Sequence, residues 1–127
     1  MRSLSVGQVL SWEKTFTLED VEAFIRLSAD ERVHPLQPDA DGRRLVHCLL
    51  LAMLPTTIGG SMNLVARDMS FTFLCPVFTG DRIRCDVEIA ETEPTEGQLR
   101  LAFAVVCRNQ HGEEVMTGTC SGVLRTA

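Results

Sequence analysis

The strongest constraint on the fold of this chain is a change in hydrophobic period at about residue 69. From there apolar and polar residues alternate over long stretches, the pattern of strands with one buried face and one face in water. The apolar positions of three such stretches are Met69, Phe71 and Phe73; Ile83, Cys85, Val87 and Ile89; and Leu99, Leu101, Phe103, Val105 and Cys107. The alternation predicts an antiparallel sheet covered on one face.

A hairpin turn and a last strand complete the predicted sheet. The run Asn109-Gln110-His111-Gly112 has the composition of a hairpin turn, which places His111 at the surface. Residues 115–124 predict the last strand, and within it Gly118 and Gly122 reduce the bulk of the second face.

Two helices are predicted ahead of the sheet. Thr17 has the hydroxyl of an N-cap, and acidic residues in the first turn and helical spacing of apolar residues predict an amphipathic helix over residues 18–29. Residues 45–54 are apolar almost all round, which predicts a central helix buried on every side. Pro55 is expected to kink that helix, and Gly59-Gly60 to mark its end.

The order of these elements predicts a single α+β domain over residues 1–127, in which a curved sheet wraps the buried helix. One face and one edge of such a sheet would stay open. Because edge-to-edge pairing of two copies would cover that edge, we expect a homodimer.

Composition disfavours several classes of partner and site. The formal net charge is −5 and the arginines are scattered, so no nucleic-acid footprint is visible. Five cysteines, an odd number without a CxxC pair, argue against a disulfide framework or a zinc site and predict buried free thiols. No signal-peptide core follows Met1, and the apolar residues 49–54 are too few to span a bilayer, so we expect a cytoplasmic protein.

Four blocks of the chain stand in a recognisable order. They are residues 16–30; Val46-His47 at the start of the apolar segment; Pro76-Val77-Phe78-Thr79-Gly80-Asp81; and residues 109–112. Together they resemble the MaoC-like, (R)-specific enoyl-thioester hydratase and dehydratase family over about residues 16–122. The resemblance implies a hotdog fold and an enzyme that interconverts 3-hydroxyacyl and trans-2-enoyl thioesters. It also implies an acyl chain carried on coenzyme A or an acyl-carrier protein, with no further cofactor.

The resemblance implies site residues as well. In that family an Asp and a His of a DxNPxH loop hold the reacting water, and a backbone N–H after a His-Gly pair at the start of the central helix holds the thioester oxygen. Here the loop reads Asp30-Glu31-Arg32-Val33-His34: the Asp matches, the His arrives one residue early, and the Asn and Pro are absent. After the helix histidine, His47, the Gly is replaced by Cys48.

The chemistry of these residue types fits three candidate catalytic residues and one binding group. Asp30 can accept a proton and orient water while His34 serves as the second acid or base. His47, beside the predicted thioester site, is the third candidate. The backbone N–H of Cys48, at a helix N-terminus, suits a developing enolate oxygen whatever the side chain.

The departures from the motif leave other functions open. Loss of the Asn is what a change of nucleophile would look like, so an amine such as glycine adding to C3 is an alternative to water. Thioester hydrolysis and a non-catalytic acyl-thioester-binding or dimer-partner subunit are further alternatives. Cys48 lacks a Cys-His-Asn arrangement and His34 with His47 lacks a known ligand spacing, so neither a thiol nucleophile nor a metal site is expected.

Overall fold

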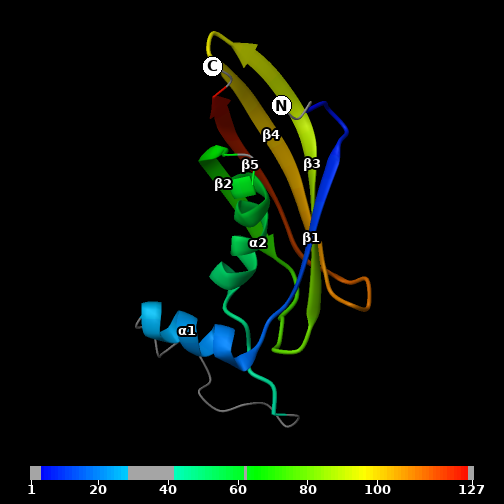
Figure 1. The fold of residues 1–127 in the computed structure, drawn as a ribbon. Coiled ribbons are helices and arrows are strands. Elements are labelled where there is room, and N and C mark those ends of the chain that lie inside the picture. Colours follow the sequence, from blue (N-terminus) through cyan, green and yellow to red (C-terminus); the bar gives the residue numbers. More distant parts are fainter. Residues whose placement is uncertain (1–3, 29–41, 62, 126–127) are drawn as a thin grey trace.

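The computed structural model describes residues 4–28, 42–61 and 63–125, which form a curved antiparallel sheet with one helix along its inner face (Figure 1). In chain order the elements are β1 (Val9–Thr15), α1 (Leu18–Ser28), α2 (Cys48–Ser61), β2 (Val65–Phe73), β3 (Arg82–Thr95), β4 (Gln98–Arg108) and β5 (Glu114–Arg125). The sheet order is β1-β3-β4-β5-β2. The predicted α+β architecture, a curved sheet around a central helix, is confirmed.

The inner face of the sheet carries the core. Neighbouring positions on β3 and β4 pair as Ile89 with Phe103 and Val87 with Val105, and all four side chains are buried. These residues alternate with exposed ones as the period of two predicts. The strands extend beyond the predicted ranges, because β3 continues to Thr95 past a bulge after Ile89.

The five cysteines are all free, but they are not all buried. Cys85 and Cys107 face one another across β3 and β4 in the core; a hydrogen bond with Cys107 and burial raise the pKa of the Cys85 thiol. Burial also raises the pKa of Cys120. Cys48 is exposed, so the expectation of buried thiols is wrong there.

Helix α1 starts at a reciprocal cap, as predicted for Thr17. The Thr17 hydroxyl accepts a hydrogen bond from the Asp20 N–H at 3.1 Å, and the Asp20 carboxylate accepts one from the Thr17 N–H at 2.9 Å. That backbone hydrogen bond is the main cause that lowers the pKa of Asp20, and Lys14, whose Nζ lies 3.3 Å from the carboxylate, lowers it further. The cap fixes the angle at which α1 leaves β1.

The central helix differs from its prediction in two ways. It starts at Cys48 rather than at Leu45, because residues 45–47 are extended. It is also not buried on every side: Leu50, Leu51 and Leu54 lie in the core, whereas Leu49 is 59% exposed and Met53 41% exposed. A single sheet can cover only one side of a helix, so the apolar far side is left open.

The end of α2 follows the sequence more closely. Pro55 lies inside the helix, and the Thr56 and Thr57 hydroxyls both donate to the Met53 carbonyl in the same turn. The helix continues through Gly59-Gly60 and ends one residue later at Ser61. Neither described helix is long and apolar enough to cross a membrane.

Strand β1 was not predicted. Its sequence, Val9 to Thr15, does not alternate, because this edge strand pairs only with β3 and leaves Val9 and Trp12 about half exposed. An edge strand of this kind needs no regular apolar face, so its period carries no signal.

The opposite edge, β2, approaches β5 closely and depends on two glycines. A Cβ atom on Gly118 would overlap the Ser70 carbonyl oxygen, and one on Gly122 would overlap the Val65 carbonyl oxygen. These are the two glycines that were predicted to thin the last strand. Beyond β5, β2 exposes Val65 and Met69 to solvent.

Candidate active site

The segment that leads into α2 is held as a short strand against the loop after β2. The Val46 N–H donates to the Val77 carbonyl at 2.8 Å, and the Thr79 N–H donates to the Arg44 carbonyl at 2.8 Å. Leu45 forms an isolated antiparallel bridge with Phe78 between these two bonds. The apolar residues 45–46 therefore serve this pairing rather than a helix, and the pairing fixes where α2 begins.

His47 caps α2. Its ring Nδ1 accepts a hydrogen bond from the Leu49 N–H at 3.0 Å, and its carbonyl accepts one from the Leu50 N–H at 3.0 Å. Histidine thus takes the place of the usual Asn, Asp, Ser or Thr at an N-cap. Because Nδ1 is the acceptor, the neutral ring carries its proton on Nε2.

The ring of His47 is also packed from one side. The centroid of Phe24, on α1, lies 4.6 Å from the imidazole centroid, with 31° between the planes. Helix α1 therefore helps to orient the residue that caps α2. This contact could not be predicted, because nothing in the spacing of residues 24 and 47 relates them.

Cys48 presents an available N–H at the start of α2. Within the described residues this N–H has no hydrogen-bond acceptor, whereas the amides of Leu49 and Leu50 are both bonded to His47. An amide at a helix N-terminus carries the positive end of the helix dipole and suits an oxygen that gains negative charge. The Cys48 N–H is therefore available for the predicted role of holding the thioester oxygen, and that role stays a prediction.

An apolar pocket of about 370 Å³ lies beside this amide. Leu45, Cys48 and Leu51 line one side, and Phe73 and Leu74, at the end of β2, line the other. A pocket of this kind suits a short hydrocarbon chain next to one hydrogen-bond donor. The sequence analysis predicted a thioester site at His47 and Cys48, which line this pocket, but it did not predict the contribution of residues 73–77.

The predicted site residues are thus divided. His47 and Cys48 both line the pocket, whereas Asp30 and His34 lie outside the described residues. The thiol of Cys48 lies 3.9 Å from Nδ1 of His47, but that nitrogen already accepts the Leu49 N–H, so it is not set to activate the thiol. Among the described residues, no group of three His, Cys, Asp or Glu side chains is arranged to hold a metal ion.

Comparison with known proteins adds the family. No family model matches the chain. It is 29% identical over 129 residues to a mitochondrial 3-hydroxyacyl-[acyl-carrier-protein] dehydratase of Arabidopsis thaliana, covering 95% of this chain and 78% of that protein. It is 34% identical over 97 residues to the (R)-specific enoyl-CoA hydratase of Aeromonas caviae, covering 69% of this chain and 72% of that protein.

The solved structures agree with the sequence relatives. The (R)-hydratase from A. caviae, which is involved in PHA biosynthesis, superimposes with a TM-score of 0.81 at 28% identity, over 99% of this chain and 100% of that one. The chain therefore belongs to the MaoC-like family of (R)-specific enoyl-CoA hydratases and 3-hydroxyacyl-[acyl-carrier-protein] dehydratases, and it has the hotdog fold of that family.

Proposed function

We propose that this protein is a lyase that reversibly adds water to a trans-2-enoyl thioester, giving a 3-hydroxyacyl thioester on coenzyme A or on the phosphopantetheine of an acyl-carrier protein. The observation that carries the proposal is the Cys48 N–H, an available donor at a helix N-terminus beside an apolar pocket. The named activities of the relatives support the same reaction.

The Cys48 amide stabilises the charge that the reaction creates. When the oxygen of water bonds to C3, the electron pair of the double bond moves through C2 onto the thioester oxygen, which becomes an enolate oxygen. A hydrogen bond from the Cys48 N–H and the dipole of α2 both favour that charge more than the neutral carbonyl of the substrate. The enolate then takes a proton at C2, and the step is complete.

The proton transfers belong to Asp30 and His34 in this proposal. One of them takes the proton of the attacking water, and the conjugate acid returns a proton to C2, so no proton is lost or gained overall. His47 acts by capping α2, because its Nδ1 is already engaged as an acceptor. The reaction needs no metal or other cofactor beyond the group that carries the acyl chain.

The acyl chain occupies the pocket between the start of α2 and the end of β2. The pocket is open at the β2 side, where Phe73 is 42% exposed and Leu74 49% exposed. A second copy of the chain that pairs along β2 would cover this side, together with the exposed Leu49 and Met53 of α2. We therefore propose that the protein is a homodimer. The cytoplasmic location and the absence of a nucleic-acid partner remain predictions.

Replacing Cys48 with proline tests the role of its amide. Proline lacks the backbone N–H, as well as the thiol, and is well tolerated at the first position of a helix, so stability should change little. We expect kcat for hydration of crotonyl-CoA to fall by about 100- to 1,000-fold, the usual cost of losing one oxyanion donor. The loss of absorbance of the conjugated thioester measures the rate.

Cys48→Ala is the matched control, because it removes the thiol and keeps the N–H. Activity equal to wild type in Cys48→Ala, with the loss confined to Cys48→Pro, supports the amide; an equal loss in both variants, which both lack the thiol, would point to the thiol. A wild-type protein inactive on enoyl thioesters of several chain lengths would overturn the hydratase proposal. An amine adduct with glycine, seen by mass spectrometry, or release of free thiol would identify the alternative reaction.

Two substitutions of His47 separate capping from catalysis. Asparagine keeps a side-chain acceptor at the N-cap and alanine removes it, while both lose the contact with Phe24. We expect His47→Ala to be less stable than His47→Asn by roughly 1 kcal/mol, and His47→Asn to retain most of the activity that His47→Ala loses. Thermal unfolding and initial rates measure the two effects. Equal inactivity of both variants, with His47→Asn folded and stable, would make the imidazole itself catalytic.

A charge on β2 tests the homodimer. Met69 is 53% exposed on the proposed contact face, so Met69→Glu should place a carboxylate in the interface and shift the protein to monomer. Thr119→Glu, on the neighbouring strand β5 but in polar surroundings, is the control and should leave the dimer intact. Light scattering with size-exclusion chromatography measures the mass. A wild-type monomer, or dimers in both variants, would contradict this arrangement.

A further inference from the structure

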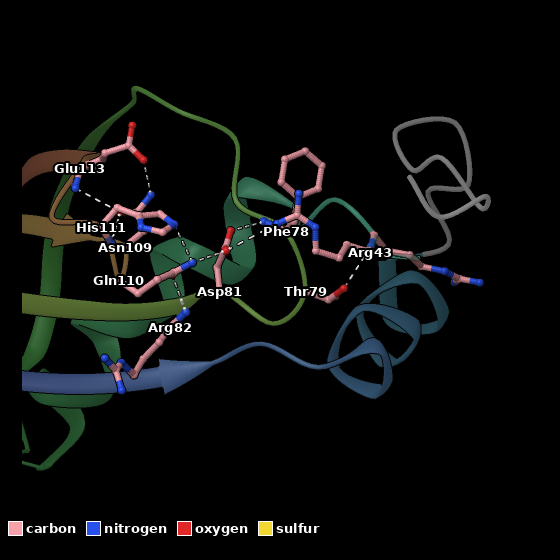
Figure 2. Close-up of polar contacts among 10 residues, drawn as sticks. Arg43, Phe78, Thr79, Asp81, Arg82, Asn109, Gln110, His111 and Glu113 are labelled. Atoms are coloured by element: carbon pink, nitrogen blue, oxygen red, sulfur yellow. Dashed lines mark hydrogen bonds and ion pairs between the residues drawn. The ribbon is translucent and has the colours of Figure 1, made fainter. Parts of the chain in front are cut away.

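One buried carboxylate lies outside the pocket, at a point where three segments meet. Asp81 is 8% exposed, although charged side chains are seldom buried without partners. Figure 2 shows it between the turn after β4, the loop before β3 and Arg43, which precedes the lead-in to α2. Its contacts connect these three segments.

Asp81 closes the tight turn that starts at Phe78. The Asp81 N–H donates to the Phe78 carbonyl at 3.0 Å, and Oδ2 of Asp81 accepts the Phe78 N–H at 2.9 Å. Gly80, with a φ of 95°, holds the third position of the turn, which requires a left-handed residue. The same turn supplies Thr79, the pairing partner of Arg44. The carboxylate therefore fixes the loop on which the lead-in to α2 rests.

Gln110 ties this turn to the β4–β5 hairpin. Its Nε2 donates to Oδ1 of Asp81 at 2.9 Å, and its Oε1 accepts the Arg82 N–H at 3.1 Å (Figure 2). Asn109 holds the hairpin turn itself, because its Oδ1 accepts the N–H groups of His111 and Glu113. The Gln110 side chain thus extends from a well-ordered turn to the carboxylate.

Two sets of contacts attach the lead-in to α2, the 44–46 segment, to the turn that Asp81 closes. The Arg43 guanidinium lies 4.8 Å from the Phe78 ring centroid, and its Nη1 lies 3.9 Å from Oδ1 of Asp81. The Arg44 N–H donates to the Thr79 hydroxyl at 3.0 Å, in addition to the backbone pairing of residues 44–46 with 77–79. The next two residues are the cap and the free amide.

From these contacts we propose that Asp81 and Gln110 are positioning residues that fix the Cys48 N–H through the 77–79 loop and the 44–46 segment. The inference rests on the proposed function for its kinetic consequence. Neither side chain lines the pocket. A misplacement of about 1 Å costs a reaction roughly 100-fold. We call the hydrogen bonds of Asp81 and Gln110 the brace. Loss of the brace would therefore lower the rate of the reaction, while the apolar contacts of the acyl chain stay intact.

Gln110→Met tests the brace, because methionine keeps the length of the side chain and removes the hydrogen bonds to Asp81 and to the Arg82 N–H. We expect kcat for crotonyl-CoA to fall by roughly 10- to 100-fold with KM within about twofold, since an interaction that matters mainly in the transition state is weakened. Gln110→Glu places a carboxylate against Asp81 and should lower kcat more than Gln110→Met does. Glu114→Gln is the control: it removes an ion pair with Arg108 in the same hairpin, does not touch the brace, and should match wild type.

The second readout needs no substrate. In the free protein, the ¹H–¹⁵N resonance of Cys48 should move in Gln110→Met but not in Glu114→Gln. A wild-type kcat and an unmoved Cys48 resonance in both Gln110 variants would overturn the brace. A Cys48 resonance that moves, in a protein inactive on enoyl thioesters, would support the brace and overturn the proposed function instead. Should Gln110→Glu fail to fold, Gln110→Met alone decides the question.

Discussion

The candidate site depends on one hydrogen bond, from the Leu49 N–H to Nδ1 of His47. It ends the extended lead-in, starts α2 and satisfies the second amide of the helix, while the carbonyl of His47 satisfies the third. The first amide, that of Cys48, is the one that remains to bind a ligand. A capping interaction normally contributes to helix stability. Here it also leaves the Cys48 N–H as the donor without a partner among the described residues.

Everything around this bond holds it at a fixed place relative to the sheet. The lead-in pairs with the 77–79 loop, the loop is closed by Asp81, and Phe24 of α1 packs on the capping ring. None of these contacts supplies chemistry. They hold one donor of the helix N-terminus at a fixed position beside an apolar pocket. Stabilisation of a developing charge requires such a rigidly placed donor.

The sequence predicted those parts of the fold that have a strict period. The strands around residues 83–89 and 99–107 and the hairpin at 109–112 are confirmed, because one face of each strand is buried in the same chain. Strand β1 was missed because it is an edge strand without a regular apolar face. The start of the central helix was placed too early, because Leu45 and Val46 continue an apolar run although they pair with a loop far along the chain.

The site was predictable to a similar degree. The Cys48 amide was predicted from the resemblance to the family, and the structure places it in the first turn of α2, where a residue leaves its N–H without a partner inside the helix. The capping role of His47 and the brace through Gln110 could not be predicted, because they join residues whose proximity depends on the whole fold. The exposure of Leu49 contradicts a helix buried on every side.

The position of the carbonyl stretch of a bound thioester tests most directly whether the Cys48 N–H holds the thioester oxygen. Butyryl-CoA, which has no double bond and cannot take up water, would be bound with an isotope-labelled carbonyl and examined by difference infrared spectroscopy. We expect the stretch to move to lower frequency in wild type and in Cys48→Ala, and this shift to be lost in Cys48→Pro. A bound thioester whose carbonyl stretch is the same in Cys48→Pro as in wild type would contradict the central claim that the Cys48 N–H holds the thioester oxygen.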